Sequence, residues 1–214
     1  MMRLLCAVST LALAACGGSL FQSKAPPASV YLLSAGAAAP SGAELPADLA
    51  VLQPRVRIGL GSDLIAVLYP DRRLDYFAGA RWSGPLDQVV QDLAIQAFRT
   101  GAKLRSVHAE SSAFGSGYWL EIDVEDFQAE YSADTGAGGS AAPTVHVRLL
   151  GRVGSSADRR ILGQFEADDR QRAADNRLTA IVEAYNRAAD AALVQIVADT
   201  TRTLSEALET GSRQ

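Results

Sequence analysis

The sequence predicts an α+β fold, with an antiparallel or mixed sheet of about six or seven strands and two main helices packed on one face. Segments in which apolar and polar residues alternate as in strands occupy much of the chain before residue 175. One amphipathic helix interrupts them near Pro85, and a longer one closes the chain. The 214 residues, 48% hydrophobic and 21% charged, are enough for one domain with an apolar core.

The first fifteen residues have the features of a bacterial lipoprotein signal peptide. Arg3 supplies a positive charge, and residues 4–15 form an apolar stretch too short to span a bilayer as a helix. Leu13-Ala14-Ala15-Cys16 resembles the lipobox, in which the cysteine is lipidated before cleavage. An ordinary signal peptide is the alternative, but the small residues on both sides of Cys16 favour lipidation there.

Lipidation would leave the mature chain without a free thiol. Cys6 lies in the removed segment and Cys16 would carry lipid, so we expect no disulfide, thiolate metal site or cysteine nucleophile. The formal charge of −4, one unit more negative once Arg3 is removed, argues against nucleic-acid binding and against adsorption to anionic lipid. Acyl chains, at about 0.8 kcal/mol per buried methylene, would anchor the domain without basic residues.

We therefore expect three parts: a signal peptide over residues 1–15, a lipidated cysteine and flexible tether over 16–29, and a single periplasmic domain over 30–214. The tether is rich in glycine, proline and other small residues and would reach about 20–40 Å. A first β-type run follows at residues 30–33. Residues 35–50 contain two glycines and two prolines and are predicted to form a loop.

The next segments predict strands and a helix. Alternation over residues 52–60 predicts a half-buried strand, weakened at its start by Pro54. Residues 64–69 and 73–77 flank a Pro-Asp-Arg turn and predict a hairpin, continued by residues 80–82. Apolar residues then recur with helical spacing up to Gly101, and Pro85 is expected at the first helical position.

A long strand with an irregularity is predicted over residues 118–131, after a shorter strand over 103–109. The apolar residues change phase near Glu125-Asp126, which predicts a β-bulge or sharp bend. The glycine-rich residues 133–142 are predicted to form a hairpin loop.

Residues 145–153 and 160–167 predict a last pair of strands, and residues from about 176 to 209 a long helix. The helix carries a stripe with heptad spacing: Leu178, Val182, Tyr185, Ala189, Ala192 and Ile196. A coiled coil with a partner is one hypothesis, but packing on the protein's own sheet is favoured because two alanines permit close approach. Polar residues beyond Thr200 predict that the end of the helix projects or frays.

No enzyme motif is found. The two histidines, His108 and His146, lie in predicted strands without metal or nucleophile spacing, which favours ordinary strand positions. Glu121, Asp123 and Glu125 alternate with apolar residues and are predicted on a solvated sheet face. We expect no catalysis, no metal, no nucleotide and no cofactor other than the covalent lipid on Cys16.

Arg81 and Trp82 stand at the end of a predicted strand, directly before the first helix. An indole there is more often a core side chain where elements meet than a binding residue, although a partner-facing anchor is the alternative. Arg81 would stack or pair beside it.

The order of these features resembles the auxiliary lipoproteins of ABC-type transport systems, of the paraquat-inducible protein C type. The resemblance rests on the lipobox, Tyr31-Leu32-Leu33, Val56-Arg57-Ile58, the hairpin at Asp71 with Leu74 and Tyr76, and Arg81-Trp82 leading into Pro85-Leu86. It implies a non-enzymatic subunit that works with mammalian-cell-entry (MCE) proteins, which build lipid-conducting assemblies, and through them with an inner-membrane permease and ATPase.

The resemblance also implies a location and a role. The chain would be anchored by Cys16 in the outer membrane on the periplasmic side, helping the conduit to dock or assemble. Gly17 after the cysteine is compatible with this under the enterobacterial sorting rule, with the inner membrane as the alternative. Tyr31, Arg81 and Trp82 would be partner-binding or core-junction residues, and self-association into a homo-oligomer is left open. A lipid carrier with a pocket between sheet and helices is the competing function.

Overall fold

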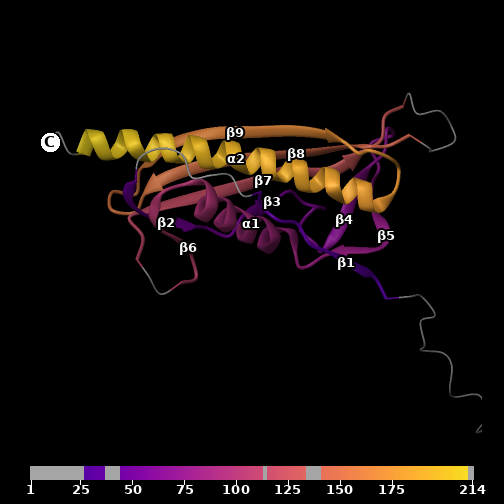
Figure 1. Ribbon diagram of the computed structural model, residues 1–214, viewed down its shortest axis with the longest axis horizontal. Helices are drawn as coiled ribbons and strands as arrows, with labels where there is room; N and C mark the ends of the chain where they lie inside the picture. The colour runs from indigo at the N-terminus through magenta and orange to yellow at the C-terminus, as the bar shows by residue number, and fades with distance from the viewer. Residues whose placement is uncertain (1–26, 37–43, 113–114, 134–140, 212–214) are drawn as a thin grey trace, which may run out of the picture.

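The structure is a computed structural model that describes residues 27–36, 44–112, 115–133 and 141–211. One layer is a mixed sheet of nine strands and the other consists of two helices (Figure 1). The predicted α+β class, the mixed sheet and the two helices are confirmed, while the number of strands exceeds the predicted six or seven. The glycine-rich loop predicted over residues 133–142 and the lipidation site Cys16 lie mostly or wholly outside the described residues.

The strands follow the order β1-β5-β4-β7-β2-β6, while β3 pairs with β7, β8 with β7, and β9 with β8. Their bounds are β1 (Ser29–Tyr31), β2 (Leu45–Val51), β3 (Arg55–Val56), β4 (Leu64–Leu68), β5 (Leu74–Trp82), β6 (Leu104–Ala109), β7 (Tyr118–Glu130), β8 (Thr144–Ser155) and β9 (Ile161–Arg172). The β4–β5, β7–β8 and β8–β9 pairs are antiparallel and the others are parallel.

Strand β7 organises the sheet. One of its edges pairs with β8 from Tyr118 to Glu130, and its other edge meets β2, β3 and β4 in turn. The register with β8 shifts between Val124 and Asp126, which confirms the predicted irregularity. Because of this bulge Phe127 takes over the core-facing phase from Val124, and Asp126 turns to the opposite face of the sheet.

The prediction for residues 35–60 is wrong in two places. Leu45–Val51 forms β2, although Pro46 and the preceding glycines predicted a loop. The proline fits because the β2–β6 register shifts between Leu45 and Asp48, so Pro46 takes no place in the ladder. The strand predicted over 52–60 is reduced to the two residues of β3, since Pro54 precedes it and the chain turns at Gly59, whose φ is 95°.

The two helices are α1 (Leu86–Gly101) and α2 (Leu178–Gly211). Helix α1 begins one residue later than predicted, because Pro85 is its N-cap and not its first helical residue. The carbonyl of Pro85 accepts hydrogen bonds from the N–H groups of Gln88 and Val89. The predicted stripe of α2 packs on the protein's own sheet, with Tyr185 and Ile196 fully buried. Leu204 is also fully buried, so α2 stays packed beyond Thr200, and its last turns extend past the sheet (Figure 1).

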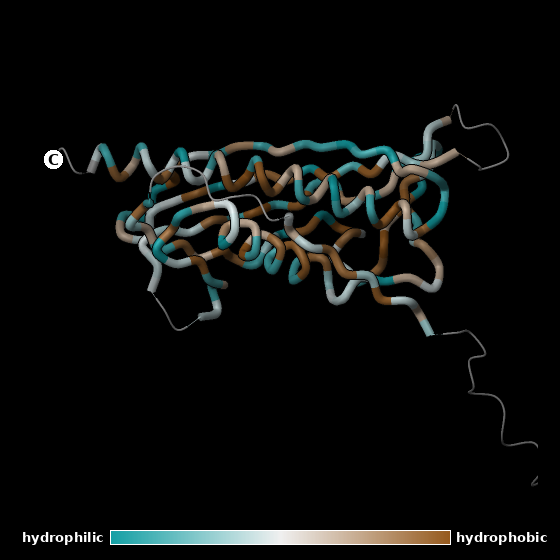
Figure 2. The backbone as a smooth tube through the Cα atoms, in the orientation of Figure 1, coloured by the Kyte–Doolittle hydropathy of each residue, from teal (hydrophilic) through white to brown (hydrophobic). Residues whose placement is uncertain are grey.

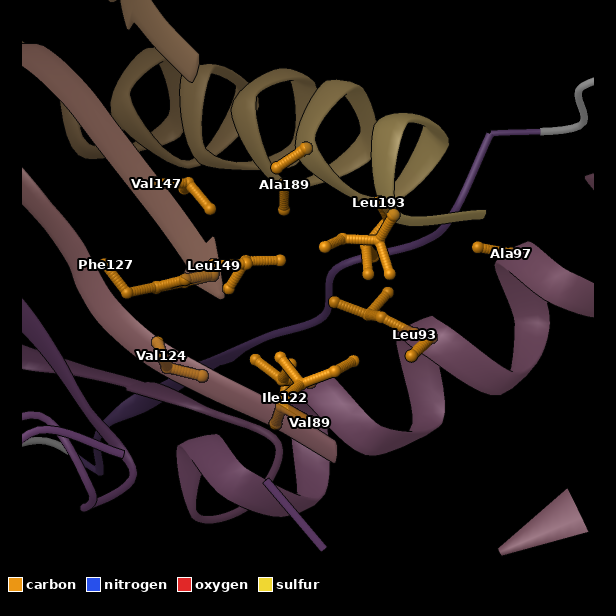
Figure 3. Packing of buried hydrophobic residues seen from close by; sticks show 14 of the residues in the cluster. Val89, Leu93, Ala97, Ile122, Val124, Phe127, Val147, Leu149, Ala189 and Leu193 are labelled. Carbon is orange, nitrogen blue, oxygen red and sulfur yellow. The ribbon is translucent and has the colours of Figure 1, made fainter. Parts of the chain in front are cut away.

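The core fills the space between the two layers. Leu93 of α1 and Leu193 of α2 converge with Ile122 of β7 and Leu149 of β8 (Figure 3). The tube in Figure 2 shows hydrophobic residues alternating with hydrophilic ones along α2, whereas β9 is mostly hydrophilic in its second half. Full burial of one such side chain contributes about 1.5–3 kcal/mol, so packing between helices and sheet is the main source of stability in the described part of the chain.

Candidate functional site

Trp82 lies in the core at the end of β5. It is 2% exposed, and its ring makes edge contacts with Tyr185 of α2 at 5.1 Å and Phe127 of β7 at 6.1 Å between centroids. The Tyr185 hydroxyl donates a hydrogen bond of 2.5 Å to the carbonyl of Ala66 in β4. Burial of the phenol raises the pKa of Tyr185 well above its ordinary value. This position favours the core role of Trp82 over a partner-facing anchor.

The structure places Tyr31 and Arg81 next to Trp82, at the edge of the sheet where β1 pairs with β5. Tyr31 of β1 is in parallel register with Trp82 and is partly buried. The Arg81 side chain is exposed and pairs with Asp63 at 3.4 Å. Cys16, the remaining predicted site residue, lies outside the described residues.

The chain after β1 is held against α2. The N–H of Ser34 donates to Oδ1 of Asn186 at 2.7 Å, and the N–H of Gly36 donates to Oδ1 of Asp190 at 2.5 Å. A Cβ at Gly36 would lie 2.6 Å from Oδ2 of Asp190, so only glycine fits without a shift. No sequence motif signals this contact, because its partners are more than 150 residues apart.

The sheet face opposite the helices carries a network of charged side chains. Glu121 and Asp123 of β7 lie between Arg55 of β3 and Arg152 of β8, with N–O distances from 2.6 to 3.0 Å. The sequence predicted these acids on a polar face, which is confirmed, but it did not indicate the arginines that pair with them. The ion pairs compensate the charges of the acids.

A second cluster, the His146 cluster, surrounds His146 of β8 and consists of Asp126, Glu130, His146, Arg148, Asp168 and Arg170. The imidazole is 6% exposed. Arg170 contacts Nδ1 at 3.0 Å, and Nε2 lies 3.1 Å from Oδ1 of Asp168. Nδ1 also lies 3.1 Å from Oε1 of Glu130, so the ring is held between a carboxylate of β7 and one of β9.

Two carboxylates of the His146 cluster, Asp126 and Glu130, have lowered pKa values. Burial by itself would raise the pKa of Asp126, but hydrogen bonds from Gln128 and Arg148 outweigh it, and the pKa lies below the ordinary value. Burial opposes ionisation of Glu130 in the same way, and hydrogen bonds from Gln128, Arg170 and His146 lower its pKa.

The other histidine of the sequence is held by serine side chains. His108 of β6 contacts the hydroxyls of Ser112 at 2.6 Å and Ser116 at 2.8 Å. In the described ranges no group of three or more His, Cys, Asp or Glu side chains is placed to hold a metal ion. No helix in the described part of the chain combines the length and apolarity needed to cross a bilayer.

Comparisons with known proteins place the chain among others of this fold. A crystal structure of a protein from Xanthomonas campestris matches with a TM-score of 0.75 and 22% identity, covering 85% of this chain and 99% of the other. A hypothetical protein from Chlamydia trachomatis matches with a TM-score of 0.51 and 11% identity, covering 74% and 98%. These likenesses show the fold, and no curated protein matches the chain. The family model for the ABC-type transport auxiliary lipoprotein component matches residues 31–197, so the chain belongs to that family.

Proposed function

We propose that this auxiliary lipoprotein is anchored through Cys16 in the outer membrane, faces the periplasm, and docks or assembles the conduit of an MCE-type ABC lipid-transport system. The observation that carries the proposal is the family match over residues 31–197, which spans the domain from β1 into α2. The lipobox at Cys16 supplies the anchor. The partners are an MCE-domain protein and, through it, a permease and an ATPase.

The arrangement of the elements supports a docking role. Strand β1, which follows the predicted tether, and the C-terminal end of α2 lie toward opposite ends of the molecule (Figure 1). The 34 residues of α2 extend over about 50 Å at 1.5 Å per residue. A domain held to the membrane near β1 would therefore present the far end of α2 at a distance from the anchor.

The competing function, a carrier with a pocket between sheet and helices, has less support. Leu93, Ile122, Leu149 and Leu193 occupy that space and are at most 3% exposed. A lipid chain there would have to displace core side chains.

Affinity purification from native membranes tests the proposal. The full chain, tagged at its C-terminus, should co-purify with an MCE-domain protein, a permease and an ATPase, and should fractionate with the outer membrane. Cys16→Ser is the control, because it should leave an unprocessed precursor that incorporates no labelled palmitate. Recovery of the chain with lipid but without transport proteins would favour the carrier. Labelling of Cys16→Ser at the parental level would contradict the anchor.

A further inference from the structure

The sheet face that the helices leave uncovered changes character from one edge of the sheet to the other. Over β7, β8 and β9 it carries charged side chains, among them Glu121, Arg152 and Asp168. Near the opposite edge, where β1 is the last strand, outward side chains are aliphatic. Val30 of β1 is 59% exposed and Leu64 of β4 is 36% exposed. Because a solvated sheet face usually carries polar side chains, this aliphatic part indicates a contact surface.

Pairing between the strands places these aliphatic side chains in one row. Val30 is the register partner of Arg81 in β5, and Arg81 is the partner of Leu64 in β4. Trp82, the residue after Arg81, is buried in the core, so the row lies on the outward face of the sheet. Arg81 pairs with Asp63 at 3.4 Å, which leaves the row without a net charge.

The segment that follows β1 extends the row. Tyr31 and Leu33 pack against the core, and the side chains between them alternate to the outward side. Leu32 is therefore on the same side as Val30, and it is 76% exposed. We call Val30, Leu32 and Leu64 the β1 patch.

The chain that leads to the β1 patch indicates what covers it. Residues 17–28 separate Cys16 from β1, and a fully extended chain of this length spans at most about 45 Å. The patch lies at the end of the molecule opposite the C-terminal end of α2 (Figure 1). The leaflet that holds the lipid of Cys16 would therefore always be within reach of the patch, at a high effective concentration. Under this condition a small apolar surface is sufficient for contact.

We propose that the β1 patch lies on the bilayer leaflet in which Cys16 is anchored, with its three aliphatic side chains inserted among the head groups and the first methylenes. The bilayer is here a supporting surface and not a transported ligand. The contact fixes the orientation of the domain, with β1 at the membrane and the end of α2 directed away from it. This inference rests on the anchor in the proposed function, and it adds which surface meets the membrane.

Site-specific fluorescence in liposomes tests the contact. The predicted mature chain has no free thiol, so one introduced cysteine takes a single thiol-reactive NBD label. Full-length variants, lipidated in cells, are reconstituted into liposomes of phosphatidylethanolamine and phosphatidylglycerol, with or without a nitroxide on the acyl chains. Leu32→Cys and Leu64→Cys report from the patch. Ile161→Cys on β9 and Val194→Cys on α2, at positions 50% and 46% exposed, are matched controls.

We expect the nitroxide lipid to quench the labels at Leu32 and Leu64 by about half or more, because inserted side chains lie at the depth of the head groups and first methylenes. The labels at Ile161 and Val194 should keep their fluorescence. Leu32→Asp, in a chain labelled at Leu64, should abolish most of the quenching, because a carboxylate is costly to place among acyl chains. Ile161→Asp in the same labelled chain should change nothing.

The outcomes separate the patch from the anchor. Equal quenching at Leu32 and Ile161, or no quenching at the patch in a chain that floats with the liposomes, would overturn the contact and leave the anchor in place. Labels at the patch that leave water only when the transport proteins are added would assign the patch to a protein partner instead. A parental chain that does not float with the liposomes would contradict the anchor and this inference together.

Discussion

Trp82 is the residue at which β5, β7 and α2 meet, since its ring contacts both Phe127 and Tyr185. Trp82→Ala should lower the free energy of unfolding by about 3–5 kcal/mol, because the cavity would open among fully buried aromatic rings. Chemical denaturation measures the loss. Trp119→Ala is the control: this indole is only partly buried and lies on the opposite sheet face, so the loss should be smaller. An unchanged melt for Trp82→Ala with reduced partner binding would instead support a partner-facing anchor.

Asp48 links the stability of the domain to pH. Hydrogen bonds from Arg105 and Ser106 lower the pKa of its carboxyl from 3.8 to about 2. A folded-state pKa below the unfolded one stabilises the fold above about pH 4, and this contribution is lost as the pH falls toward 2. The lowered pKa values of Asp126 and Glu130 act in the same direction.

The melting temperature should therefore fall steeply between about pH 4 and 2. Asp48→Asn should lower the melting temperature at pH 7 and make the acid-induced fall smaller. Glu183→Gln, an exposed change on α2, should follow the parental curve. If the melting temperature of Asp48→Asn falls with pH as steeply as that of the parent, the Asp48–Arg105 pair does not contribute to the pH dependence of stability.

At the scale of elements, α2 packs closely on the sheet because its buried face includes small residues. Ala188 and Ala192 are at most 1% exposed, whereas Ala191 faces solvent. Ala192→Leu should destabilise the domain by about 1–3 kcal/mol, because the added methylenes have no space against the strands. Ala191→Leu should change stability by less than about 0.5 kcal/mol. A neutral Ala192→Leu would mean that α2 can move away from the sheet, as expected of a helix that also pairs with a partner.

The elements also differ in how well local sequence predicts them. The hairpin of β4 and β5, helix α1 and the bulge in β7 follow from turn residues, helical spacing and a change of phase within one segment. Strand β2 does not, because what makes it a strand is its position between β6 and β7, where a shift in register accommodates Pro46. The charged network on the uncovered face could likewise be predicted only in part. The acids alternate with apolar residues along β7, but the arginines that pair with them come from β3 and β8.

At the scale of the whole molecule, the tether is predicted to set the distance from the membrane to the partner. Strand β1 begins at Ser29, which pairs with Ala80, so a deletion of residues 19–24 would shorten the tether and leave the strand intact. Complementation of a transport-deficient strain and recovery of partners should both fall, because the reach becomes shorter. Membrane fractionation should stay normal.

Replacement of residues 19–24 by a glycine–serine linker of equal length is the control and should restore complementation.

His108→Ala combined with His146→Ala should leave complementation close to the parental level apart from a loss of stability. A harmless deletion together with an essential histidine pair would contradict the docking role.

The sequence by itself determined the features that depend on neighbouring residues. These are the lipobox-like motif that predicts lipidation of Cys16, the α+β class and the two helices, since a motif or a periodicity lies within one segment. Only the tertiary structure decided which distant residues meet. The contact of Gly36 with Asp190, the burial of Trp82 between Phe127 and Tyr185, and the His146 cluster all join residues that are far apart in the chain. The register and the bulges of the strands are fixed by pairing between distant segments. They determine which side chains lie on the same face of the sheet.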